Sequence, residues 1–163
     1  MILTWNLYSK GSLRNERLTK QNRPSFYFGE VKGANLLHLQ GVWRDILGID
    51  GKANVLTEYY YNDIRTIATI DCVSNDFSMH IIRFTKQPIS KFSLNVINFT
   101  AYVYLRDTGV QLDYGVLYAI NPQRPQNYER KVLSITPESL ADTEQKLYNL
   151  TDRYKMLFME PTI

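Results

Sequence analysis

The stretch RTIATIDCVSNDFSMHIIRF, residues 65–84, decides the expected fold. Residues 65–73 are rich in β-branched and apolar side chains that favour strands. The tripeptide Ser74-Asn75-Asp76 then supplies turn-forming residues. Residues 77–84 resume an apolar run, which predicts a second strand paired with the first. A strand, a turn and another strand in succession indicate a β-rich domain.

Runs of similar length flank this pair on both sides. Residues 42–47 and 54–61 precede it, and Asp50-Gly51 between them is typical of a hairpin turn. Further runs follow at residues 92–99, 101–106, 114–120 and 128–135. About eight short strands separated by turn residues predict a sandwich or an up-and-down antiparallel β-barrel.

The last part of the chain has a different pattern, TPESLADTEQKLYNLTDRYKM. Thr136 followed by Pro137 is a helix start signal, since threonine caps helices and proline suits the first helical position. Apolar residues then recur at helical spacing. The sequence therefore predicts an amphipathic α-helix over residues 136–157 that packs on the outside of the barrel.

Residues 1–35 form an N-terminal arm that is predicted to be irregular and is basic. The arm carries six basic residues against two acidic ones, a net charge of +4, so the remaining residues sum to −1. Two interpretations remain open: a solvated arm, or a segment similar to a mitochondrial transit peptide. Residues 36–163, the expected barrel domain, offer no basic excess, so we expect no nucleic-acid partner.

Length and composition point to one ordinary domain. The chain has 163 residues with 44% hydrophobic and 21% charged residues, a globular balance. No run approaches the roughly 20 apolar residues of a spanning helix, so we expect no transmembrane segment. One cysteine and the absence of a signal-peptide pattern favour an intracellular location over secretion.

No motif predicts catalysis. His38, His80 and Cys72 share no metal-ligand spacing, and the chain has neither a nucleophile elbow nor a glycine-rich phosphate loop. Cys72 paired with His80 is a conceivable nucleophile, but a thiol within an apolar strand is more typical of a buried structural cysteine. We therefore expect no metal, no cofactor and no enzymatic activity.

Three blocks of the sequence resemble the lipocalin family. Gly41-Val42-Trp43 is similar to the family's G-x-W, and residues 102–120, with Asp113 and Tyr114, are similar to its turn-and-strand block. Residues 131–156, which include Pro137, resemble its last strand and closing helix. Ile135 replaces the arginine that covers the signature tryptophan in that family. The resemblance implies an eight-stranded up-and-down barrel with an external C-terminal helix.

The resemblance also implies which residues line a ligand cavity. The expected lining residues are Tyr59, Val103, Leu105, Gly115, Leu117, Lys131 and Leu133. Lys131 and Glu129 lie on one face of the last strand, toward the barrel mouth. This pair either contacts the polar head of a ligand or is a solvated rim pair worth little energy.

Two functions follow from these expectations. The first is a carrier that holds a small hydrophobic or amphipathic ligand, such as a fatty acid, lipid or isoprenoid, inside the barrel. The alternative is a non-catalytic accessory subunit of a larger assembly, a mitochondrial one among the candidates, docked through residues 1–35. Neither the ligand nor the partner is named by the sequence.

Overall fold

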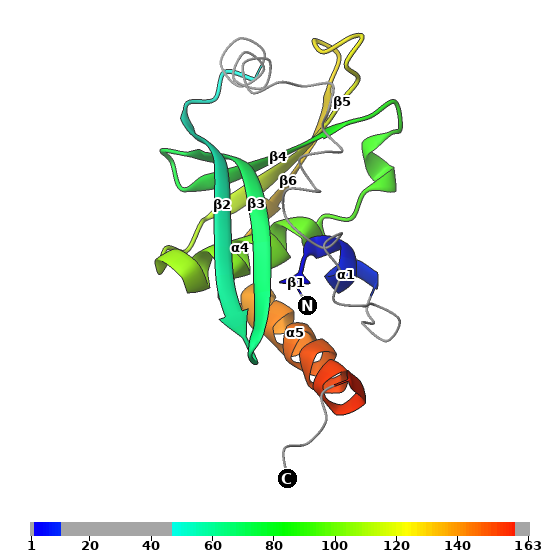
Figure 1. The fold of residues 1–163 in the computed structure, drawn as a ribbon. Coiled ribbons are helices and arrows are strands. Elements are labelled where there is room, and N and C mark those ends of the chain that lie inside the picture. Colours follow the sequence, from blue (N-terminus) through cyan, green and yellow to red (C-terminus); the bar gives the residue numbers. More distant parts are fainter. Residues whose placement is uncertain (1, 11–46, 159–163) are drawn as a thin grey trace.

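A computed structural model of the chain describes residues 2–10 and 47–158 (Figure 1). Gly41, Trp43 and residues 11–46 of the arm and first predicted strand lie outside the described residues. The described elements, in chain order, are β1 (Ile2–Leu3), α1 (Trp5–Lys10), β2 (Gly51–Tyr61), β3 (Ile64–Ser74), β4 (Ser78–Phe84), η3 (Ile89–Lys91), α4 (Asn95–Thr108), β5 (Tyr114–Ile120), β6 (Glu129–Ser134) and α5 (Pro137–Phe158).

The strands form one open, mixed sheet rather than a closed barrel. Its order is β1-β3-β4-β5-β6, with β2 paired to the other edge of β3. β4 and β5 are parallel, as are β1 and β3, whereas the remaining neighbours are antiparallel. The predicted eight-stranded antiparallel barrel is therefore wrong, because parallel neighbours need a crossover segment that an up-and-down barrel does not contain.

That crossover is α4, which occupies the place of two predicted strands. Residues 92–99 and 101–106 were expected to be extended because they are rich in β-branched and aromatic side chains. They instead supply a helix with seven buried residues, and packing on the sheet overrides the local propensity. The helix ends at Gly109, which adopts a left-handed conformation with φ of 78° and donates its N–H to the Leu105 carbonyl at 2.7 Å.

α4 lies very close to β5, and Gly115 makes the approach feasible. A Cβ atom at position 115 would lie 2.4 Å from Ile97 Cγ2 and 3.1 Å from Met79 Cγ. Both Ile97 and Met79 are fully buried, with 0% exposure, so neither side chain can move into solvent. The glycine is therefore required by the contact between helix and sheet.

Replacing Gly115 with alanine is expected to lower the free energy of unfolding by about 1–3 kcal/mol, as overpacking does in closed cores. Urea denaturation measures the loss. The same substitution in an Ile97→Ala background removes the clashing Cγ2 atom, so the loss should shrink there. Equal losses in both backgrounds would show that this contact is not the cause.

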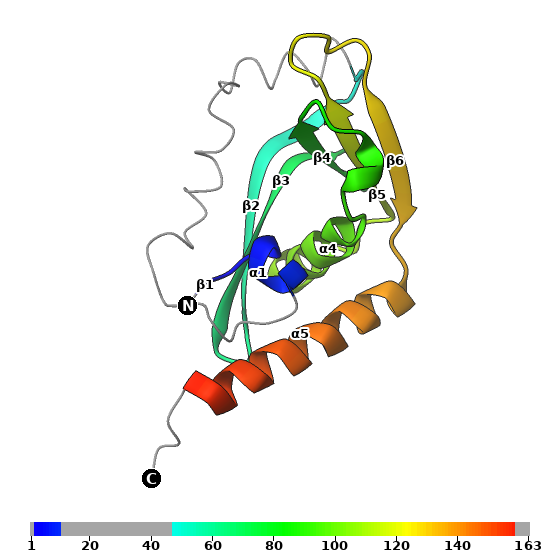
Figure 2. The same ribbon diagram turned by 90° about the vertical axis from the view of Figure 1, so that its right-hand side faces the viewer.

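The predicted C-terminal helix is confirmed as α5. Thr136 and Ser139 cap it reciprocally: each backbone N–H donates to the other's hydroxyl at 3.0 Å. α5 and α4 lie on the same side of the sheet, and α1 packs beside them (Figure 2). The main core fills the space between these helices and the sheet, with Phe99, Leu117 and Leu147 among its fully buried members.

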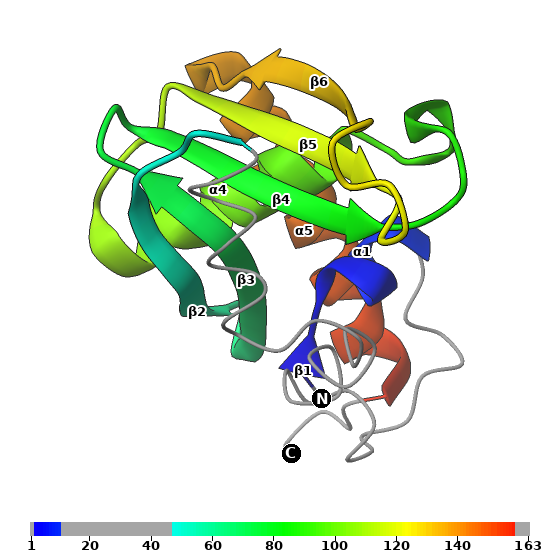
Figure 3. The ribbon, with the colours of Figure 1, turned by 90° about the horizontal axis from the view of Figure 1, so that it is seen from above.

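The sheet is divided into two parts by a change in direction. Seen from above, β2 and β3 run at a steep angle to β4, β5 and β6 (Figure 3). A smaller apolar cluster that includes Ile82, Val116 and Ile120 lies on the face of β4 and β5 opposite the main core. Within the described residues, no helix combines the length and apolarity needed to cross a membrane.

Candidate active site

The change in sheet direction leaves one edge of β3 interrupted. β1 pairs with this edge at Arg65 and Thr66, and β4 pairs with it at Cys72 and Val73. Between these two contacts, no described strand pairs with residues 67–71 on that side. The interruption places side chains from the N-terminal segment, β3, β4 and α4 around a common space.

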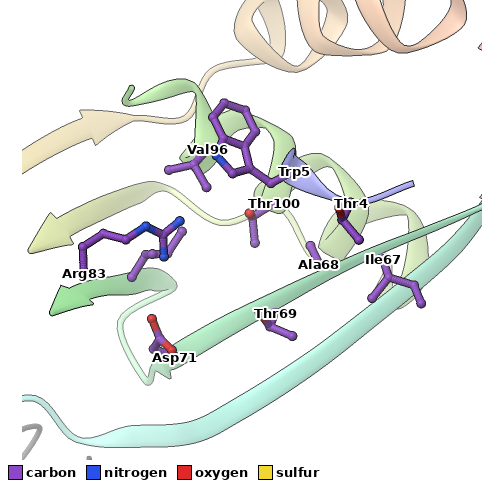
Figure 4. Close-up of a pocket in the computed structure, with 10 residues that line it drawn as sticks. Thr4, Trp5, Ile67, Ala68, Thr69, Asp71, Arg83, Val96 and Thr100 are labelled. Atoms are coloured by element: carbon purple, nitrogen blue, oxygen red, sulfur yellow. The ribbon is translucent and has the colours of Figure 1, made fainter. Parts of the chain in front are cut away.

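A small cavity of about 30 Å³ occupies this interruption (Figure 4). That volume is enough for about two water molecules. It is lined by Thr4, Trp5, Ile67, Ala68, Thr69, Asp71, Ile81, Arg83, Val96 and Thr100. Trp5 packs on Tyr8 and Phe99 of the core, with ring centroids 5.8 and 6.0 Å away, so the N-terminal wall of the cavity is fixed in place.

Asp71 is the carboxylate of this cavity and lies where β3 and β4 separate. In a continued antiparallel ladder Ile82 would pair with Ile70 of β3. The Ile82 N–H instead donates to Asp71 Oδ2 at 2.7 Å, so the side chain replaces a backbone acceptor. Burial raises the pKa of Asp71 to about 6, against the opposing effects of that hydrogen bond and of the Arg83 charge.

Arg83 supplies the positive charge of the cavity. It lies two residues beyond Ile81 on β4, so alternation brings both side chains to the cavity face. The half-buried Arg83 favours the ionised form of Asp71, and its Nη1 lies 3.5 Å from the Ile82 carbonyl oxygen. A guanidinium beside a carboxylate in a water-sized cavity suits an anionic group such as a phosphate that approaches from the open side.

The donor set around Asp71 does not by itself fit a metal ion. Two-metal sites are common in nucleases, and hard cations take several oxygen ligands. No group of three or more His, Cys, Asp or Glu side chains gathers among residues 2–10 and 47–158. Arg83 lines the same cavity as Asp71, and its positive charge disfavours a bound cation there.

A second cluster of polar side chains lies on the face of β4 opposite the cavity, where the side chains are joined by a chain of buried hydrogen bonds. The Ser78 hydroxyl donates to Asp76, so its oxygen accepts from His80 Nε2 at 2.9 Å. His80 Nδ1 then accepts from the Tyr118 hydroxyl at 2.8 Å. Ser78, His80 and Tyr118 are at most 5% exposed, so this chain is closed to substrates and stabilises the fold.

Burial lowers the pKa of His80 to about 4; Asp76 opposes this shift and Arg130 adds to it. The unfolded chain takes up a proton below pH ~6.5, whereas the folded chain resists protonation until pH ~4. The free energy of unfolding should therefore fall across this window, by about 3 kcal/mol from His80 alone.

Urea denaturation at pH 7 and pH 4.5 measures this loss for the wild type and for His80→Gln. The variant should lose less stability on acidification, although it is less stable at pH 7. Gln123→Asn, at an exposed position with no titratable group, is the control and should keep the wild-type difference. An unchanged pH dependence in His80→Gln would contradict the assignment.

The residues expected to line a barrel are dispersed. Gly115 and Leu117 are buried on β5 against α4, Val103 and Leu105 belong to α4, and Leu133 is half-buried on β6. Tyr59 lies on β2 and accepts a hydrogen bond from Arg106 at 2.7 Å, whereas Lys131 and Glu129 are exposed on β6. None of these residues lines the described cavity.

The former signature positions have other roles. Pro137 begins α5, and Tyr114 begins β5 and donates to Asp76 at 2.6 Å. The Asp113 carbonyl accepts the Ile135 N–H at 2.9 Å. Cys72 is buried, as expected, and burial raises its thiol pKa to about 11.

Asp71 and Arg83 were missed at the sequence level, although a signal was present. Each is a charged residue within an otherwise apolar strand, in TIDCV and HIIRF. Charged residues are rarely buried without a partner. What the sequence did not supply was the register that brings the two strands together at this point.

Solved structures share this fold. LHK-Exo, an alkaline exonuclease from Laribacter hongkongensis, matches with a TM-score of 0.59 and 9% identity over 94% of this chain and 88% of that chain. Its complex with dAMP matches with a TM-score of 0.58 and 10% identity over the same shares. SSO0001 matches with a TM-score of 0.50 and 15% identity over 81% of this chain, which spans 61% of that protein.

No family model matches the sequence, and no curated protein does so either. Identities this low establish a shared fold and no more.

The lipocalin resemblance is corrected by these findings. The sheet is open and mixed, and the similar solved structures are exonuclease-like folds rather than barrels. The expected carrier of a hydrophobic ligand is therefore wrong, and nothing supports the accessory-subunit alternative. The expectations of no enzymatic activity and no nucleic-acid partner do not agree with these neighbours either, since LHK-Exo is an alkaline exonuclease and one of its structures is a complex with dAMP.

Proposed function

We propose that this protein hydrolyses phosphodiester bonds of nucleic acid at the cavity between β1, β3, β4 and α4. The observation that carries the proposal is the placement of Asp71 and Arg83 together at the interruption of the β3 edge. A carboxylate with a pKa raised to about 6 can act as a general base, and a guanidinium can bind a phosphate.

Each of the two residues has a defined chemical role. Arg83 donates hydrogen bonds to the non-bridging phosphate oxygens and offsets the charge that develops on them. Asp71 acts as a general base, since a pKa near 6 leaves it ionised at neutral pH yet basic enough to accept a proton. The raised pKa arises mainly from burial, which is a common way to tune a catalytic carboxylate.

The reaction proceeds by attack of water on phosphorus. Asp71 accepts one proton from a water molecule as the water oxygen forms a bond to phosphorus. The bond between phosphorus and the departing sugar oxygen breaks, and that oxygen takes a proton from solvent. The products are a phosphate monoester and a free sugar hydroxyl, after which Asp71 returns its proton to solvent.

The shared fold supports the choice of nucleic acid as the substrate. LHK-Exo is an alkaline exonuclease, and a nucleotide, dAMP, occupies one of its structures. The same arrangement of strands and helices extends over most of both chains. Since fold alone does not fix function, the proposal rests on the two charged residues of the cavity.

An oligonucleotide assay tests the proposal. The full chain is incubated with end-labelled single-stranded and duplex DNA and RNA, with and without added Mg²⁺, and products are separated by size. Wild type should release shortened products, as should a variant in the exposed Asp142, Asp142→Asn. Asp71→Asn should release none. Products absent from the wild-type reactions, or equal in Asp71→Asn, would refute the proposal.

A further inference from the structure

Thr100 of α4 differs from the other buried threonines. Thr143 and Thr151 donate to helix carbonyls at 2.7 and 2.8 Å. Thr57 donates to Asp107 at 2.9 Å, and Thr66 donates to the Ile64 carbonyl at 3.2 Å. Thr100 is 2% exposed, yet among the described residues its hydroxyl has no hydrogen-bond partner. Among the described residues, the buried side-chain atoms without a partner are Arg65 Nε and Asn98 Oδ1, and the Thr100 oxygen is not one of them. The Thr100 oxygen is therefore open to a water molecule in the cavity that Thr100 lines.

The cavity that Thr100 lines has room for a polar partner such as water. Val96 and Thr100 lie one helical turn apart on the same face of α4, which closes the cavity opposite β3 (Figure 4). On β3, Thr69 and Asp71 are two residues apart and face the same space. A volume of about 30 Å³ admits about two water molecules among these lining groups.

We propose that Thr100 is a positioning residue that holds and orients the water molecule from which Asp71 takes a proton. One O–H of that water points to the free oxygen of the Asp71 carboxylate, since Oδ2 already accepts the Ile82 N–H. The other O–H points to Thr100 Oγ1. A lone pair of the water oxygen is then directed to the open side, where Arg83 places the phosphate. The catalytic role of Thr100 rests on the proposed hydrolysis. The presence of a water molecule bound by Thr100 and Asp71 does not depend on that function.

Kinetics of two variants test the role. Thr100→Val keeps the β-branched shape and removes the hydroxyl, so kcat should fall about 10- to 100-fold while KM stays within about 2-fold. Thr100→Ser retains a hydroxyl and should recover most of kcat. Thr143→Val, at a buried threonine on α5, is the matched control and should keep the wild-type kcat. An unchanged kcat in Thr100→Val would overturn the proposal, as would a Thr100→Ser that is as slow as Thr100→Val.

A crystal structure at high resolution separates this inference from the proposed function. Wild type should show an ordered water within hydrogen-bond distance of Thr100 Oγ1 and Asp71, and Thr100→Val should lose it. A dry cavity in the wild type overturns the inference even if the protein cleaves nucleic acid. An ordered water in a protein that cleaves nothing supports the site but refutes the hydrolytic function.

Discussion

Replacing Asp71 with asparagine is expected to slow hydrolysis severely and, at neutral pH, to make the protein more stable. Asparagine retains an oxygen that can accept the Ile82 N–H, so the link between β3 and β4 is preserved. The variant cannot accept a proton from water, and loss of a general base costs about 100- to 10,000-fold in rate. The same change removes a desolvated charge from the folded state.

The stability gain should depend on pH. The folded-state pKa of Asp71 is raised to about 6, above its value of 3.8 in the unfolded chain, so the folded chain binds protons more tightly between these values. The cost of burying the charge is therefore fully present above pH ~6 and disappears below pH ~4. Asp71→Asn should gain about 1–3 kcal/mol at pH 7.5 and almost nothing at pH 4.

Urea denaturation at both pH values, together with the oligonucleotide assay, measures the two effects in one preparation. Asp142→Asn, an exposed site on α5, should change neither activity nor stability. A variant at position 71 that loses activity and stability together would indicate that Asp71 is structural. Opposite changes in the two quantities are typical of a residue retained for function at the expense of stability.

Replacing Arg83 with glutamine is expected to lower kcat/KM about 100- to 1,000-fold, the loss typical of a removed donor to a developing negative charge. A second effect follows from the electrostatics. Arg83 favours the ionised form of Asp71, so its removal should raise the pKa of that carboxyl and shift the pH–rate profile upward.

Arg83→Lys separates charge from geometry. Lysine keeps the positive charge near Asp71 but lacks the planar fork that binds phosphate through two parallel hydrogen bonds. We expect Arg83→Lys to retain the wild-type pH–rate profile while kcat/KM falls by about 10-fold, an intermediate loss. Wild-type kcat/KM in both variants would contradict a phosphate-binding role for Arg83.

The elements that were predicted correctly are those determined by local sequence. The strands at residues 54–61, 65–73, 77–84, 114–120 and 128–135 correspond to β2 to β6, and the Thr136-Pro137 start signal correctly located α5. In each of these cases the propensity, the turn residues and the packing favour the same structure.

The elements that were missed depend on contacts between distant parts of the chain. α4 has the composition of a strand, and it is a helix because β4 and β5 are parallel and need a crossover. Gly109 after α4 was the one local signal for a helix end in this region. β1 consists of two residues whose strand conformation follows from pairing with β3 some sixty residues later, a contact that no local pattern contains.

The candidate site was missed for the same reason. Asp71 and Arg83 are separated by a turn and lie on strands that are paired only at Cys72 and Val73 of β3, and both line the cavity next to this pairing. Thr100 reaches them from α4, which was predicted to be two strands. The resemblance to a barrel predicted instead a site lined by residues such as Leu133 and Lys131, which lie on β6 and do not line this cavity.

The pH–rate profile of the wild-type protein tests the central claim most directly. We predict that kcat/KM for oligonucleotide cleavage rises through a single ionisation near pH 6 and reaches a plateau above it, because Asp71 must lose its proton to act as the base. A profile that is flat between pH 5 and 8, or one that falls as Asp71 ionises, would contradict that claim.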